Sequence, residues 1–284
     1  MDVHFRGVRG STPAPGLAYV RYGGHTSCVA ITRSGEPPRL ILDAGTGLRT
    51  VTALLDGAPF DGTILLGHLH WDHVHGLPFF RSGGMPGARV DVVLPAPDGD
   101  ALGTLSRGLS PPHFPIEPQQ LGAGWRFSAV RPGWQCIEGY DVLAREIPHK
   151  GGQTFGFRIT DGSYTIAYLS DHWPTSVGPG TDGLGEIHPV ALELAADVDL
   201  LIHDAQFLAA EFPAVNYLGH AAVDYAIALA AAAGSRRLAL FHHAPERTDA
   251  ELDDVARTVR GAAVDTFVAA EGMSVELGAL ARPR

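Results

Sequence analysis

The feature that most constrains this chain is a dense group of histidines at the end of an apolar run. In "LLGHLHWDHVHG" (residues 65–76), four histidines and one aspartate occupy positions 68, 70, 72, 73 and 75. The run "TILLG" (63–67) is typical of a buried strand, so the group lies where that strand ends. Residues two apart in an extended segment point the same way, so His68, His70 and Asp72 can converge. His73, at the turn into the next element, can reach a neighbouring point beside Asp72.

This mixture of imidazole and carboxylate donors suits a borderline divalent metal, with zinc expected first and manganese or iron as alternatives. One such motif holds too few donors for two metals, so others must come from elsewhere in the chain. Three candidates each follow a predicted strand: His149 in "REIPHKGG", Asp171 in "IAYLSDHW" and His242 in "LALFHHAP". Strand ends that gather at one edge of a sheet hold side chains rigidly. We therefore expect these groups to form one site.

Periodicity predicts an α/β protein in which two sheets pack together with helices outside. A helix is expected after "LDAGTG", where Leu48, Val51, Leu54 and Leu55 recur at helical spacing, and a capping box of Thr248 and Glu251 predicts another. A further helix is expected at 221–233, ended by Gly234. The Pro-rich "SPPHFP" (110–115) is expected to be a structural loop, with a place at the rim of a pocket as the alternative. Strands are expected at 3–6, 27–32, 40–42, 63–67, 125–130, 142–147, 154–159, 165–169, 198–202 and 238–241.

Composition narrows the classes of function. The 284 residues carry a formal net charge of −10, which argues against an extended grip on nucleic acid, because phosphate contacts need clustered Lys and Arg. We expect one domain, 1–284, in the cytoplasm, since neither a signal peptide nor a membrane span is evident. The two cysteines, Cys28 and Cys136, lack metal-type spacing, so we expect both to be buried thiols in a reducing compartment.

The motif His-x-His-x-Asp-His, with "LILDAGTG" before it and the later His, Asp and His, resembles the metallo-β-lactamase-fold hydrolases. That resemblance implies a four-layer αββα sandwich of two mixed β-sheets with helices outside, and a site for two divalent metal ions at the sheet edge. It implies that His68, His70 and His149 hold one metal, that Asp72, His73 and His242 hold the other, and that Asp171 bridges them. Asp43 then supports the ligands by hydrogen bonding, without binding metal. His243 is the rival for the role of His242 and otherwise a supporting residue.

Within that fold, "LLIHDAQF", "YLGHAAVDYAIALAAAAG" and "LALFHHAP" resemble the branch of ribonuclease Z and the small cyclic phosphodiesterases. His220 stands where that branch carries a histidine near the substrate phosphate. Between His149 and Asp171, however, the chain has room only for a short hairpin, where ribonuclease Z carries an arm that grips tRNA. Ala221 also replaces the usual hydroxyl residue, and His25 stands where asparagine is expected. The short hairpin and the acidic chain lead us to expect a small-molecule substrate and no extended nucleic acid, whereas Ala221 and His25 leave the finer choice of substrate open.

The resemblance implies a metal-bridging hydroxide that attacks a small or cyclic phosphodiester, with Asp72 orienting it and His220 stabilising the transition state or protonating the leaving oxygen. Lys150, the one lysine of the chain, is a candidate to bind a substrate anion, although an exposed lysine without a task explains it better. Trp71 can wall the pocket or stack on a ring of the substrate, and core packing explains it equally well. The alternatives are a lactone, thioester or lactam hydrolase of the same fold and a non-hydrolytic carrier of a cofactor precursor. Relatives also suggest a homodimer, and no membrane partner is expected.

Overall fold

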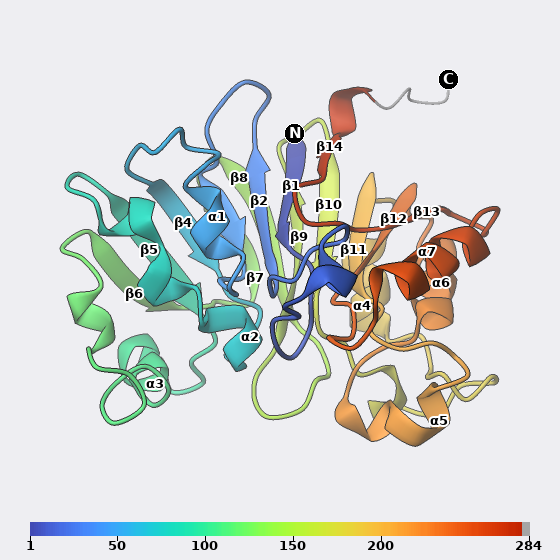
Figure 1. Ribbon diagram of the computed structural model, residues 1–284. Coiled ribbons are helices and arrows are strands. Elements are labelled where there is room, and N and C mark those ends of the chain that lie inside the picture. The colour runs from blue at the N-terminus through green and yellow to red at the C-terminus, as the bar shows by residue number, and fades with distance from the viewer. Residues whose placement is uncertain (280–284) are drawn as a thin grey trace.

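The computed structural model describes residues 1–279, which form two mixed seven-stranded β-sheets packed face to face (Figure 1). The first sheet runs, in spatial order, β14 (Ser274–Glu276), β1 (Asp2–Gly7), β2 (Cys28–Thr32), β3 (Leu40–Leu42), β4 (Asp61–Leu65), β5 (Arg89–Leu94) and β6 (Trp125–Ala129). The second runs β13 (Asp265–Val268), β12 (Arg237–Phe241), β11 (Leu200–Asp204), β10 (Thr165–Leu169), β9 (Phe155–Thr160), β8 (Tyr140–Glu146) and β7 (Gly133–Ile137).

Helices lie on the outer faces of both sheets, on opposite sides of the molecule in Figure 1. Those near the first sheet are α1 (Leu48–Val51), α2 (Trp71–Val74) and α3 (Ala101–Ser106). Those near the second are α4 (Pro189–Ala195), α5 (Phe212–Val215), α6 (Val223–Ala232) and α7 (Asp249–Thr258). Short 3₁₀ turns lie at Leu17–Tyr19, Leu77–Phe79, Arg81–Gly84, Pro118–Gln120, Pro174–Ser176, Asn216–Leu218 and Leu277–Ala279. The predicted four-layer αββα sandwich is confirmed.

Alternation along each strand divides the apolar side chains among three cores. In β4, Leu65 enters the core between the sheets, whereas Ile64 faces the helices of the first sheet. In β11, Ile202 faces the inter-sheet core, and Leu201 packs under the helices of the second sheet. Burial of each such side chain contributes about 1.5–3 kcal/mol. The packed side chains therefore hold the two sheets at a fixed separation, so the strand ends of one sheet lie in fixed positions relative to those of the other.

Strand direction brings the proposed site residues to one edge of the sandwich. β3 and β4 run parallel in the first sheet, as do β10, β11 and β12 in the second. β8 has the direction of β10, because each pairs antiparallel with β9. The segments after these strands, which carry the predicted ligands, therefore leave the two sheets at neighbouring ends.

Some local predictions need correction. The helix expected after "LDAGTG" is only the four residues of α1, followed by turns. The strand expected at 198–202 lies two residues later, because β11 continues into His203 and Asp204, which are polar but fully buried. Cys28 is buried as expected, but Cys136 is exposed, because it lies on the edge strand β7. Within the described residues, no helix is both long and apolar enough to cross a membrane.

Candidate metal centre

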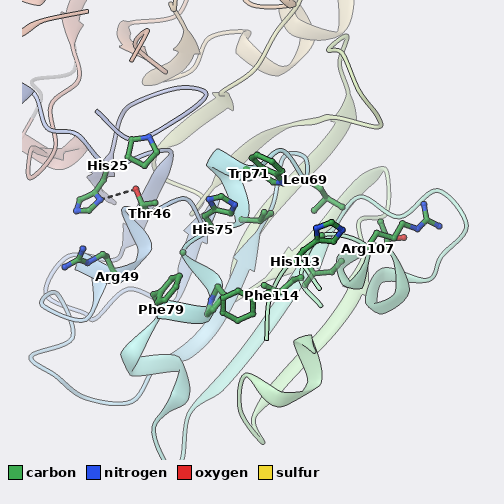
Figure 2. A pocket seen from close by; sticks show the side chains of 18 residues that line it. His25, Thr46, Arg49, Leu69, Trp71, His75, Phe79, Arg107, His113 and Phe114 are labelled. Atoms are coloured by element: carbon green, nitrogen blue, oxygen red, sulfur yellow. Dashed lines mark hydrogen bonds between the residues drawn. The ribbon is translucent and has the colours of Figure 1, made fainter. Parts of the chain in front are cut away.

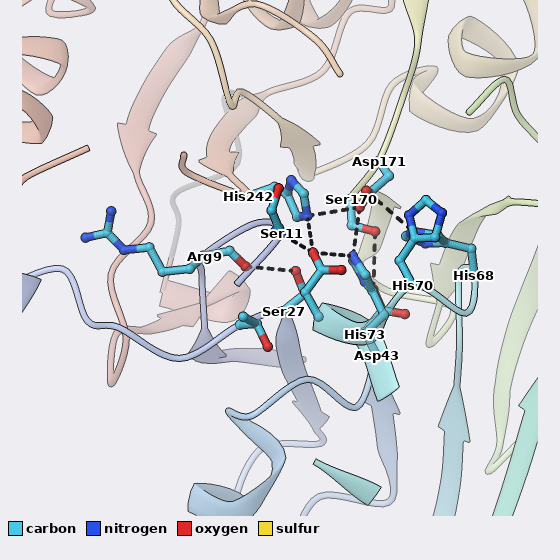
Figure 3. Close-up of polar contacts among 12 residues, drawn as sticks. Arg9, Ser11, Ser27, Asp43, His68, His70, His73, Ser170, Asp171 and His242 are labelled. Carbon is cyan, nitrogen blue, oxygen red and sulfur yellow. Dashed lines mark hydrogen bonds and ion pairs between the residues drawn. The ribbon is translucent and has the colours of Figure 1, made fainter. Parts of the chain in front are cut away.

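The seven predicted ligands come together at this edge in two groups that share Asp171. Donor atoms of His68, His70, His149 and Asp171 lie within 4.8 Å of one another, and those of Asp72, His73 and His242 do so as well. In Figure 3, His242 lies on one side of Asp171, and His68 and His70 lie on the other. A third set of donor atoms within this distance belongs to Asp171, His220 and His242.

Asp171 turns one carboxylate oxygen toward each group. Its Oδ1 lies 3.1 Å from His73 Nε2 and 3.3 Å from His242 Nε2. Its Oδ2 lies 3.5 Å from His68 Nε2 and 3.4 Å from His149 Nε2. This residue follows β10 in the second sheet, whereas His68 and His73 follow β4 in the first. Asp171 thus contacts histidines of both groups, and its own strand belongs to the opposite sheet from the strand that precedes His68 and His73.

Buried atoms without a hydrogen-bond partner show that this donor set fits divalent metal ions. Both ring nitrogens of His68, Nε2 of His73 and Oδ1 of Asp171 are buried and form no hydrogen bond. A buried polar atom left in this way costs free energy, so such atoms are rare unless a ligand compensates them. Nitrogen and carboxylate donors in this ratio match zinc and related ions.

The charges around the centre leave most of these ligands in the form that binds metal. Burial lowers the pKa of His70 and lowers that of His149 to about 4. Burial and the nearby His73 hold the pKa of His68 well below its ordinary range. These three imidazoles are therefore neutral at pH 7. Burial opposes the charged form of Asp171, but His242, His73 and His68 outweigh it and hold its pKa well below the ordinary range. His68, His70 and His149 therefore present neutral nitrogens, and Asp171 presents ionised oxygens. The pKa of His73 and that of His242 are instead raised, because nearby carboxylates, Asp72 and Asp171 among them, outweigh burial.

Hydrogen bonds on the outer side of three histidines aim their Nε2 atoms at the centre. His73 Nδ1 donates to Asp43 Oδ2 at 2.7 Å, and His149 Nδ1 donates to the carbonyl of Gly219 at 2.8 Å. His242 Nδ1 lies 3.0 Å from Gln206 Oε1. Such contacts fix both the tautomer and the ring orientation of a metal ligand. The supporting contact predicted for Asp43 is present.

His220 lies on the wall of a cavity of about 360 Å³ above the ligands, which Ser11, Leu69, His70, Trp71, Asp72 and Asp171 also line. Its Nδ1 donates to Asp204 Oδ2 at 2.9 Å, so Nε2 is the ring atom left for another partner. The ring stacks on that of His242, with centroids 5.0 Å apart. Asp204 is fully buried and also accepts from the backbone N–H groups of His172 and Gln206, so its position is rigid.

With this geometry in hand, comparison with known proteins places the chain. A family model described as a β-lactamase superfamily domain matches residues 38–243, a range that includes every predicted ligand. The chain belongs to the β-lactamase superfamily. Together, that membership and the complete donor set identify it as a metal-dependent hydrolase.

Three individual proteins show how far this superfamily likeness extends. A curated ribonuclease Z from Gemmatimonas aurantiaca is 26% identical, over 97% of this chain and 95% of its own. The metallo-β-lactamase fold protein YhfI from Bacillus subtilis is 20% identical with a TM-score of 0.71, covering 97% and 99% of the two chains. A diphosphatase from the PhnP family is 17% identical with a TM-score of 0.72, covering 97% of each chain. At these identities, the two structures establish the fold.

Two predicted site residues lie elsewhere. His243 faces away from the centre: its Nε2 donates to the carbonyl of Ala269 at 2.9 Å, and its ring contacts Tyr22. The structure therefore does not bring the ring of His243 to the centre, where a supporting role was predicted for it. Lys150 is exposed, and its Nζ lies 5.4 Å from the centroid of the Trp173 ring, outside the residues that line the cavity.

Other residues of the site were missed from the sequence. Asp204 lies two residues after the apolar run "LLI" in "LLIHDAQF", which is the signal that could have revealed it. Gln206 had no such signal, since its role depends on a contact with His242 across two strands. Ser11 donates its backbone N–H to Asp72 Oδ2 at 2.6 Å, a contact that carries no side-chain signature.

Proposed function

We propose that this hydrolase holds two divalent metal ions, zinc first among them, and cleaves a small phosphodiester. The observation that carries the proposal is the placement of Asp171 between two donor groups, beneath a cavity whose wall holds His220. The curated relative named ribonuclease Z supports the bond type, since a ribonuclease cleaves phosphodiester bonds.

One ion would be held by His68, His70 and His149, the other by Asp72, His73 and His242, with Asp171 shared. When bound, such a pair supplies an ionised water as nucleophile and positive charge toward the phosphoryl oxygens. In the overall reaction, the oxygen of water bonds to phosphorus and one P–O ester bond breaks. The leaving oxygen takes up a proton, and the products are a phosphomonoester and an alcohol.

Asp72 and His220 are the residues to which we assign chemical roles. Asp72 Oδ2 accepts the backbone N–H of Ser11 at 2.6 Å and lies 3.1 Å from His242 Nε2, so its carboxylate is fixed at the cavity floor, where it orients the attacking water. His220 acts from Nε2, because Asp204 occupies Nδ1. From the cavity wall, Nε2 donates to the phosphoryl or leaving oxygen as negative charge develops there.

A small substrate is favoured over a folded RNA by charge and by shape. The net charge of −10 opposes a long polyanion. Between His149 and Asp171 the chain forms only the hairpin of β9 and β10, with a turn at residues 161–164. No additional arm is therefore available there to hold a nucleic acid beside the cavity.

The test is hydrolysis of bis(p-nitrophenyl) phosphate and of a small cyclic phosphodiester by zinc- or manganese-loaded protein. We expect turnover by the wild type, loss of it in Asp72→Ala, and a fall in kcat of about 10²–10⁴-fold in His220→Ala with two metals per chain retained. His4→Ala, which removes a half-buried histidine bonded to Ser274 and Thr32, is the matched control and keeps wild-type activity.

Two results would contradict the proposal. Metal-loaded protein that hydrolyses no phosphodiester, but opens lactones or thioesters, would assign the same centre to carbonyl chemistry. Cleavage of RNA without turnover of the small diesters would make the preference for a small substrate wrong.

A further inference from the structure

A second and larger cavity, of about 980 Å³, adjoins the metal centre. Leu69 and Trp71 line both this cavity and the smaller one above the ligands. Helix α2 forms the common wall: Asp72 and His73 turn toward the metal centre, whereas Val74 and His75 face the larger cavity. A molecule reacting at the centre can therefore extend past Trp71 into this space without leaving the protein surface.

The middle of the larger cavity is aromatic (Figure 2). Trp71 stacks on His75, with centroids 5.7 Å apart and planes 18° apart. Phe79 meets Phe114 edge to face, with centroids 6.2 Å apart. Figure 2 shows the guanidinium ends of the two arginines on the lining, Arg49 and Arg107, pointing outward from this group of rings. The charged atoms are thus at the margin, and the interior suits an uncharged ring.

Two of these rings are unusually exposed. Trp71 is 70% and Phe79 64% accessible to solvent, so core packing does not explain either residue. Exposed aromatic side chains that gather in a concave site are typical of a surface that a ligand covers. Phe114, from the Pro-rich loop "SPPHFP", also lines the cavity, so the loop takes the place at a rim that was the alternative to a structural role.

We propose that this aromatic cavity binds the non-reacting arm of the substrate, and that this arm is an aryl or aryl-alkyl group of one or two rings. The inference rests on the proposed function and makes it more specific: the substrate is a phosphodiester whose phosphate lies at the metal centre and whose apolar ester arm lies between Trp71, Phe79 and Phe114. A cavity of this volume is typical for an organic ligand of moderate size.

The test compares trifluoroethyl phosphodiesters whose second arm is methyl, benzyl or 2-naphthylmethyl, with trifluoroethanol release followed by fluorine NMR. The leaving group is small and constant, so only the second arm can fill the aromatic cavity. We expect kcat/KM of the wild type to be at least about 10-fold higher for the naphthylmethyl than for the methyl arm, because burying the rings removes apolar surface from water.

Gly108→Trp is the most direct variant. Gly108 lines the cavity, and a Cβ added there meets nothing within 4 Å, so an indole can enter the space without moving the backbone. We expect the naphthylmethyl-to-methyl ratio to fall to about 1–2 in this variant, and to fall about 5-fold in Phe79→Ala. Trp134→Ala is the matched control: it removes a 57% exposed ring on β7, outside the aromatic cavity, and leaves the ratio unchanged.

Binding measured without turnover separates this inference from the proposed function. Calorimetry with 2-naphthylmethylphosphonate and methylphosphonate, whose C–P bonds are not cleaved, should show tighter binding of the naphthyl compound that Gly108→Trp abolishes. If no diester is hydrolysed but this difference appears, the proposed function fails and the cavity assignment stands. Equal binding of both compounds, or a ratio that Gly108→Trp leaves unchanged, would overturn the assignment, as would a dimer that Phe79→Ala dissociates.

Discussion

Asp43 shows how one buried carboxylate can organise several ligands. It accepts hydrogen bonds from the backbone N–H of Gly67 at 2.8 Å, His73 Nδ1 at 2.7 Å, Tyr168 Oη at 2.7 Å and Ser170 Oγ at 3.2 Å. These donors come from both sheets, beside His68 and Asp171. Asp43 itself has a φ of 59°, a left-handed conformation that a residue other than glycine adopts only at a cost. That conformation places its carboxylate under the centre.

Replacing Asp43 with alanine should weaken metal binding more than it changes the fold. Without the acceptor at Nδ1, the tautomer and orientation of His73 are no longer fixed, so we expect zinc affinity to fall about 10–100-fold in competition with a chelator. Asp249→Ala is the control, since it removes a buried carboxylate that bonds to the backbone of Arg21 and Tyr22, away from the centre. Equal losses of zinc affinity in both variants would refute a specific role for Asp43.

At the scale of elements, α2 is too short to be stable alone and is held by the loop after β3. The N–H of Ala44 donates to the carbonyl of His73, and the N–H of Gly76 donates to the carbonyl of Ala44, both at 2.8 Å. A Cβ added at Gly45 would lie 2.2 Å from the carbonyl oxygen of Asp72. Gly45 thus permits the close backbone approach that fixes the predicted ligands Asp72 and His73.

Gly45→Ala should therefore damage the centre through the backbone. We expect a loss of about 1–3 kcal/mol in the free energy of unfolding, measured with urea, together with fewer bound metals per chain. Gly108→Ala is the matched control, because the added methyl group meets open space, and its stability should stay within about 0.5 kcal/mol of the wild type. A Gly45→Ala protein with full stability and metal content would show that α2 is held by other contacts.

The helices and strands also show which parts of the fold could be predicted from the sequence. The strand predicted at 165–169 matches β10, and the capping box of Thr248 and Glu251 begins α7, because these signals are local. The three-residue β14 and the helix α4 were not predicted: one is too short to show a period, and the other packs its apolar side chains under a sheet formed elsewhere in the chain. The predicted ligands come together because they follow strands whose ends meet at one edge. Gln206 was missed because only tertiary packing brings it to His242.

The whole molecule buries an unusual number of neutral imidazoles, and this makes its stability sensitive to acid. Burial lowers the pKa of His243 to about 3 and also lowers that of His203. Burial, together with the nearby His203 and His188, holds the pKa of His172 well below its ordinary range. The unfolded chain takes up these protons near pH 6.5, whereas the folded chain takes them up only at lower pH. These groups therefore destabilise the fold as pH falls below 6.5 and have no such effect above it.

His243→Gln isolates one such contribution, since glutamine can still donate a hydrogen bond to the carbonyl of Ala269. For each unit by which pH falls below 6.5, the protonation of His243 should lower the free energy of unfolding of the metal-free wild type by about 1.4 kcal/mol. The variant lacks this histidine and does not lose that amount. Between pH 7 and pH 5, the free energy of unfolding, from urea denaturation, should shift by about 2 kcal/mol in favour of the variant. Parallel profiles for the two proteins would show that His243 is protonated in the folded state.

The sharing of the centre between two sheets has a consequence for how the protein is made. Synthesis delivers β1 to β6 with four of the proposed ligands first, and His242 only after β12, while β14 later returns to pair with β1. A nascent chain thus carries an incomplete metal site until His242 has been added. Hydrolytic activity arises only when the second sheet has docked on the first, and a polypeptide truncated before β12 is inert whatever metal it captures.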